Sequence, residues 1–149
     1  MLKFRSVTTS VFIFCLFLNQ LSGCKEKTIS TKLSCENDKT QCLKLANSKT
    51  EIRFNTPQLF SEQAYDVEVK TDKMINKAYL SGINMKMGRI PFLMEGTSTG
   101  YNGQIFLGMC SEPIMKWNLT VIYGDETVDV FEVTSYWNKE VYFNSMEGN

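Results

Sequence analysis

The sequence predicts an all-β protein: an antiparallel β-sandwich of about seven short strands over residues 51–149. Two observations predict this class. Apolar and polar residues alternate with a period of two in several runs, and no segment shows a long helical period. The chain has 149 residues and is 43% hydrophobic, which suffices for one domain with a buried core. A closed small barrel is the architectural alternative.

The clearest strand is expected over residues 115–121, where four apolar residues alternate with three polar ones. The turn sequence Tyr123-Gly124-Asp125-Glu126 and a strand over 127–135 complete a hairpin. Residues 65–70 alternate in the same way and predict a half-buried strand. Four further strands are expected over residues 52–55, 78–87, 103–110 and 141–144.

The composition excludes several classes of function. The chain has 16 basic and 16 acidic residues and no long basic run, which argues against binding nucleic acid through its phosphates. It contains no His, so it can form neither a Ser-His-Asp nor a Cys-His catalytic group, and no imidazole-ligated metal site. A glycosidase-like carboxylate pair is the remaining enzymatic option, but the acidic residues show no evident pairing. We therefore expect no catalysis.

Residues 1–23 have the pattern of a secretory signal peptide. Lys3 and Arg5 precede an apolar run of eight residues at 11–18, which is too short to span a bilayer. The run leads to Leu21-Ser22-Gly23-Cys24, which resembles the lipobox of bacterial lipoproteins. This resemblance implies cleavage before Cys24 and attachment of diacylglycerol, with acyl chains such as palmitate, to its thiol. An ordinary secreted protein with a chance cysteine is the alternative.

The lipid would anchor the chain to a bacterial envelope membrane, facing the periplasm. Lys25 after the lipidated cysteine resembles the signal that sorts lipoproteins to the outer membrane. Residues 24–50 are polar and are expected to be the lipidated N-terminus and a flexible tether. Cys35 and Cys42 lie in this segment, and in an oxidising compartment their spacing favours a small disulfide loop.

Sulfur-containing residues concentrate between residues 85 and 115, where five of the eight methionines lie. On a strand Met85 and Met87 would project from one face, and Cys110 and Met115 flank a short turn. Thioether and thiolate sulfur are soft ligands that select Cu(I). Met85, Met87, Cys110 and Met115 are therefore the predicted metal ligands.

Two observations keep other readings open. Methionine commonly fills irregular gaps in a core, so the same residues could be packing residues. If Cys35 pairs with Cys42, Cys110 is left over. It could ligate a metal, be buried as a small hydrophobic residue, or instead form a disulfide with Cys35 or Cys42.

Two stretches in this region resemble known proteins. Residues 84–91 follow the pattern Asn-Met-x-Met-Gly-x-x-Pro, and residues 108–117 follow Gly-x-Cys-Ser-x-x-x-Met-x-Trp. The pair resembles small uncharacterised periplasmic proteins of proteobacteria. It is also loosely similar to the YtkA-like and FixH-like immunoglobulin-like proteins of copper handling and cytochrome oxidase assembly. The resemblance implies an immunoglobulin-like sandwich, Cu(I) as the bound metal, and a protein partner that receives copper in respiratory-enzyme assembly.

A metal-free envelope lipoprotein is the alternative function. Such a protein would act as a structural module or bind another protein through a strand edge or a loop. Methionines that serve only as packing would be shielded from solvent and scattered through the sandwich. Methionines that serve as ligands would converge on Cys110 at one end.

Overall fold

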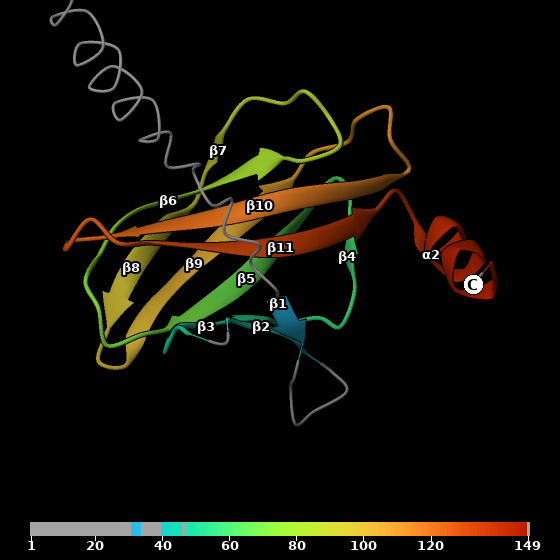
Figure 1. Cartoon of the computed structure of the whole chain (residues 1–149). Helices are drawn as coiled ribbons and strands as arrows, with labels where there is room; N and C mark the ends of the chain where they lie inside the picture. Colours follow the sequence, from blue (N-terminus) through green and yellow to red (C-terminus); the bar gives the residue numbers. More distant parts are fainter. Residues whose placement is uncertain (1–30, 34–39, 46, 149) are drawn as a thin grey trace, which may run out of the picture.

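The computed structural model describes residues 31–33, 40–45 and 47–148, which form two β-sheets packed face to face and one short helix (Figure 1). The elements in chain order are β1 (Thr31–Leu33), β2 (Gln41–Leu45), β3 (Glu51–Phe54), β4 (Leu59–Phe60), β5 (Gln63–Lys70), β6 (Ile75–Gly82), β7 (Ile90–Pro91), β8 (Leu93–Thr97), β9 (Gly100–Leu107), β10 (Ile114–Tyr123), β11 (Val128–Tyr136) and α2 (Lys139–Glu147).

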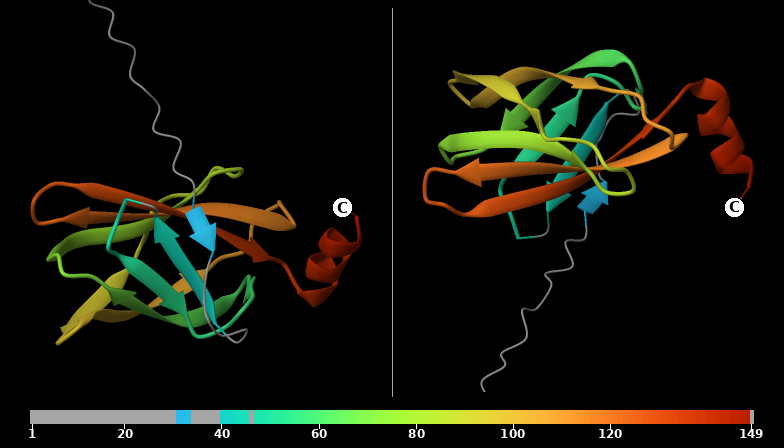
Figure 2. Two further views of the ribbon diagram at one scale, coloured as in Figure 1. Left: turned by 60° about the horizontal axis from the view of Figure 1, so that its bottom comes forward. Right: turned by 90° about the horizontal axis from the view of Figure 1, so that it is seen from above.

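The strand order confirms an immunoglobulin-like sandwich. One sheet has the order β1-β2-β3-β5-β9-β8 and the other β4-β11-β10-β6-β7, and all neighbours are antiparallel except β4 and β11. Immunoglobulin domains place strands ABED in one sheet and strands C, F and G in the other. Strands β3, β5, β9 and β8 occupy the ABED positions, and β6, β10 and β11 occupy those of C, F and G. The sheets stay open, so the barrel alternative is not adopted (Figure 2).

The period-2 runs supply the core as expected. On β5 the residues Tyr65, Val67 and Val69 are buried between the sheets. On β10 every second residue from Met115 to Tyr123 is buried, and β10 and β11 form the predicted hairpin. One buried polar pair lies inside the core, where Trp117 Nε1 donates to Ser135 Oγ at 3.0 Å. Alternation therefore located the strands that carry most of the core.

Three of the expected strands differ in the structure: one does not form and two are shorter than expected. Residues 141–144 lie in α2 and form no strand, because the side chain of Asn138 caps a helix by accepting a hydrogen bond from Val141 N at 2.9 Å. Strand β6 ends at Gly82, short of the expected residue 87, and β9 ends at Leu107, short of residue 110. The chain is thus irregular at two places where the sequence suggested continued strands.

The sheet also extends upstream of residue 51. Strand β2 pairs with β3, and β1 pairs with β2, so part of the segment expected to be a tether adds two strands to the edge of the sandwich. At the other end of the chain, α2 projects from the end of the sandwich that β11 leaves (Figure 1). The described strands number eleven, where about seven were expected, because short edge strands join the sheets on either side of the core.

Candidate metal centre

The loop after β6 is fastened to the start of β10 through Asn84. The Asn84 amide donates to the Ile114 carbonyl at 2.8 Å, and its Oδ1 accepts from Lys116 N at 2.9 Å. The neighbouring Ile83 N donates to the Lys116 carbonyl at 2.8 Å. The loop therefore leaves the sheet but stays against β10. The expectation that Met85 and Met87 share one strand face is wrong, since β6 ends at Gly82 and both residues lie beyond it.

Two of the predicted ligands are core residues. Met115 lies on β10 with 0% of its surface exposed, and Met85 is 9% exposed within the same buried cluster. Met85 lies directly over the end of β6: a Cβ atom on Gly82 would come within 2.6 Å of Met85 Cγ. The glycine at this position is what allows the methionine side chain to fold back onto its own strand.

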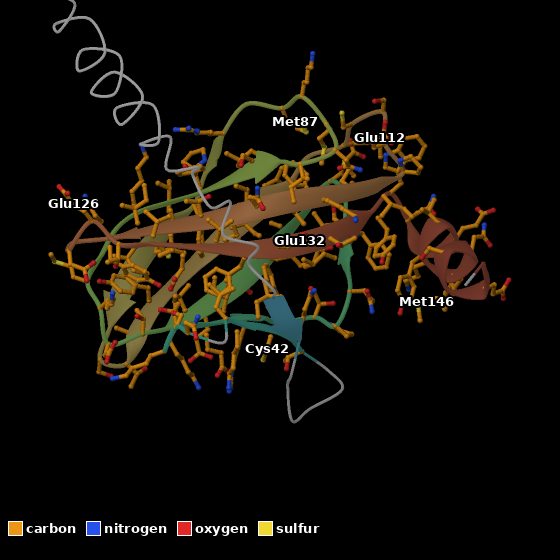
Figure 3. The ribbon with its side chains drawn as sticks, in the orientation of Figure 1. Cys42, Met87, Glu112, Glu126, Glu132 and Met146 are labelled. Atoms are coloured by element: carbon orange, nitrogen blue, oxygen red, sulfur yellow. The ribbon has the colours of Figure 1, made fainter. Side chains whose placement is uncertain are left out.

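The other two predicted ligands lie at the margin of this cluster. Met87 and Cys110 are half-buried and pack against the core. Met87 Cε lies 3.4 Å from the place that a Cβ atom on Gly108 would take, so the methyl group of Met87 reaches the loop that carries Cys110. Figure 3 shows Met87 in the loop after β6 and Glu112 in the loop after β9, both at the end of the sandwich away from Glu126.

The loop that carries Cys110 is held by Trp137, the residue directly after β11. Trp137 Nε1 donates to the Cys110 carbonyl at 3.0 Å, and Trp137 N donates to the Pro113 carbonyl at 3.0 Å. Cys110 itself is a free thiol, whose Sγ lies 3.9 Å from Ser111 Oγ. These contacts fix the backbone of the loop and leave the sulfur available for other chemistry.

The three segments with predicted ligands therefore meet at one end of the sandwich: the loop after β6, the loop after β9, and the first residues of β10. The donor set would be three thioethers and one thiol. In the part of the chain that the structure describes, no group of three or more His, Cys, Asp or Glu side chains is placed to hold a metal ion. Of the four predicted ligands, only Cys110 is one of these residue types.

Asn84 and Trp137 position this site, and sequence reasoning did not assign either of them a role. Asn84 lies inside the first of the two quoted stretches, two residues after the glycine that ends β6. At such a strand end an Asn side chain often makes the hydrogen bonds that the backbone of a continued strand would have made. For Trp137 no local signal exists, because its contact with Cys110 joins residues 27 apart.

The predicted signal peptide, Cys24 and Cys35 lie outside the described residues, so the lipidation and the Cys35–Cys42 disulfide stay predictions. Cys42 is buried on β2, which pairs with β1 on one side and with β3 on the other. Among the described residues, no helix has both the length and the apolar character needed to cross a membrane.

Comparison of the chain with protein-family models, with curated proteins and with solved structures finds no match to any of them.

Proposed function

We propose that this chain is a lipid-anchored protein of the bacterial periplasm that binds Cu(I) through Met85, Met87, Cys110 and Met115. The observation that supports it is the meeting of the sulfur-bearing segments at one end of the sandwich, where Asn84 ties the first loop to β10. The resemblance of residues 84–91 and 108–117 to copper-handling proteins points in the same direction.

The surroundings of the proposed site suit a soft monovalent cation. A Cys110 thiolate would balance the single charge of Cu(I), so the complex would be neutral, and a neutral complex loses little on entering the apolar cluster around Met85 and Met115. Thioethers require no deprotonation, so three of the four ligands are ready to bind at any pH. Zn²⁺ would leave a net positive charge in the same apolar surroundings, and we expect it to bind poorly.

The exposed side of the site supports a role in transfer. Met87 and Cys110 are partly exposed, whereas Met85 and Met115 are buried in the core. A partner protein could therefore reach the metal from the side of the two loops, and the lipid at Cys24 would keep the exchange close to the membrane. The receiving protein would be a respiratory enzyme during its assembly.

The direct test is a competition assay in which the reduced, mature chain competes with a Cu(I) chelator under anaerobic conditions. We expect about one Cu(I) per chain, and we expect Cys110→Ser to weaken binding most because it removes the only charged ligand. The changes Met85→Leu, Met87→Leu and Met115→Leu nearly conserve volume, so each should lower stability by less than about 1.5 kcal/mol while clearly weakening Cu(I) binding. Unchanged affinity in Cys110→Ser would refute the proposal.

Met74→Leu is the matched control. Met74 is 70% exposed and lies against Gly124 in the turn between β10 and β11, at the other end of the sandwich from the proposed site. The substitution makes the same change in side-chain chemistry, so it should leave both the copper affinity and the stability unchanged.

The burial of Met85 and Met115 favours a second function, because packing residues are shielded from solvent in the same way. In that case the chain is a metal-free envelope lipoprotein that binds a protein or serves a structural role. The methionine variants distinguish the two functions: as packing residues, Met85 and Met115 would affect stability while the copper affinity stayed the same.

A further inference from the structure

Strand β8 is an open edge of the six-stranded sheet. It pairs with β9 alone, and its register with β9 runs without a shift from Leu93 to Thr97. In an antiparallel pair every second residue of an edge strand turns its N–H and C=O away from the partner. Proteins usually protect such edges with lysine, proline or a bulge, yet β8 has the sequence Leu-Met-Glu-Gly-Thr, and Leu93 is 77% exposed.

A groove of about 1010 Å³ lies beside this edge, on the outer face of the same sheet. The strand register arranges its lining in two rows that run across β3, β5, β9 and β8. One row contains Arg53, Glu68, Asn102 and Glu95; the other contains Asn55, Asp66, Gln104 and Leu93. Because residues in a row share one face of the sheet, these side chains all belong to the outer surface.

The groove is negatively charged. Three carboxylates line it, from Asp66, Glu68 and Glu95, against one guanidinium, from Arg53, and that guanidinium is already paired with Glu51. The amides of Asn55 and Gln104 donate to the two carboxylate oxygens of Asp66 at 3.3 and 3.1 Å, which holds its charge in the groove without neutralising it.

The remaining carboxylates are weakly compensated. The Glu68 carboxylate lies 3.7 Å from the Lys70 ammonium, and each side chain is 42% exposed, so water screens this ion pair. Among the described residues Glu95 makes no ion pair with a lysine or an arginine. The surface next to the free edge therefore favours a positively charged ligand.

We propose that β8 binds an extended segment of a partner protein that carries Lys or Arg at alternate positions. The segment would add to the sheet as a further antiparallel or parallel strand and pair with the free peptide groups of β8. Alternate side chains of an added strand point to one face, so a basic residue would lie beside Glu95 on the outer face. Asp66 and Glu68 lie on β5, two strands further from the edge than Glu95, and would attract the basic segment through their electrostatic field.

This binding site is separate from the sulfur-rich end and does not depend on copper. The probe is a fluorescent eight-residue peptide that alternates Lys and Thr, with fluorescence anisotropy measured on the full mature chain at low salt. A peptide with Glu in place of Lys tests the charge, and a Lys-Thr peptide methylated at every backbone nitrogen tests the strand pairing. We expect the Lys-Thr peptide to bind and both control peptides to fail.

Variants of the chain locate the site. Glu95→Gln should weaken binding about two- to fivefold, which is the range for an exposed charge pair, and Glu68→Gln should weaken it less. Glu126→Gln removes the same charge in the turn between β10 and β11 and should have no effect. Equal binding of the methylated peptide, equal affinity of Glu95→Gln and the unaltered chain, or no binding of the Lys-Thr peptide would each overturn the proposal. A homodimer whose formation occupies the β8 edge would overturn it as well.

Discussion

The hydroxyl of Tyr123 links the two sheets at the end of the sandwich opposite the sulfur-rich loops. It shares a hydrogen bond of 2.6 Å with Thr50 Oγ1, just before β3, and donates to Asp129 Oδ2 at 2.7 Å. Ser48 Oγ donates to the same carboxylate oxygen at 2.5 Å. Changing Tyr123→Phe keeps the buried ring and deletes both hydrogen bonds of the hydroxyl.

The expected loss follows from these two bonds. A hydrogen bond between neutral groups contributes about 1 kcal/mol, and one to a charged group about 1.5–3 kcal/mol. Asp129 is half-buried and still accepts a hydrogen bond from Ser48 in the variant. The free energy lost with the Tyr123–Asp129 bond therefore lies at the lower end of that range. We therefore expect Tyr123→Phe to lower the free energy of unfolding by about 2.5 kcal/mol.

The same hydroxyl makes stability depend on alkaline pH. Burial raises the pKa of Tyr123 far above its ordinary value, and the hydrogen bond and charge of Asp129 raise it further. Above about pH 10 the unfolded chain loses this proton and the folded chain keeps it, so stability falls as the pH rises. Phenylalanine has no hydroxyl proton to lose, so this pH dependence is absent from the variant. The difference in stability between the wild-type chain and the variant should therefore shrink above about pH 10.

The assay is urea unfolding followed by tryptophan fluorescence. With a slope of about 2 kcal/mol/M, a loss of about 2.5 kcal/mol moves the midpoint by about 1.2 M urea. Tyr79→Phe is the control, because its hydroxyl makes no hydrogen bond to the described part of the chain, although its ring contacts Arg89. A midpoint for Tyr123→Phe that equals the control's would refute the reasoning.

Three further predictions concern the turns and the anchor. Gly100→Ala should lower the free energy of unfolding by more than about 2 kcal/mol, because φ is +151° and a Cβ atom would come within 2.0 Å of a β5 carbonyl oxygen. Gly88→Ala is the control, because a Cβ atom there meets nothing within 4 Å and stability should change little. A threonine hydroxyl and then the Lys73 ammonium lower the pKa of Asp125 to about 2, and an NMR titration of the carboxyl carbon should show Lys73→Met raising it. Cys24→Ala should yield unlipidated protein, and mass spectrometry that finds an unmodified Cys24 at the wild-type N-terminus would contradict the anchor.

The candidate site shows how far local sequence reaches. The sequence picked out Met85, Met87, Cys110 and Met115 by residue type and clustering, and the structure brings the segments that carry them to one end of the sandwich. The geometry proposed for Met85 and Met87, a shared strand face, was wrong. The loop geometry depends on the hydrogen bonds that Asn84 makes to β10, 30 and 32 residues away in the chain, and periodicity carries no information about them.

The sequence by itself determined the sandwich class and its central strands, because a strand between a core and water requires a period-2 pattern that can be read along the chain. It thereby located β5, β10 and β11. The tertiary structure alone decided which segments lie at the edges. Residues 41–45, which were expected to belong to a tether, form a strand because β3 offers them an unpaired edge. Residues 141–144 form a helix because the chain has left the sheet, where Asn138 can cap them. Edge strands and caps depend on partners that are distant in sequence, or on where the chain leaves a sheet, and local alternation specifies neither.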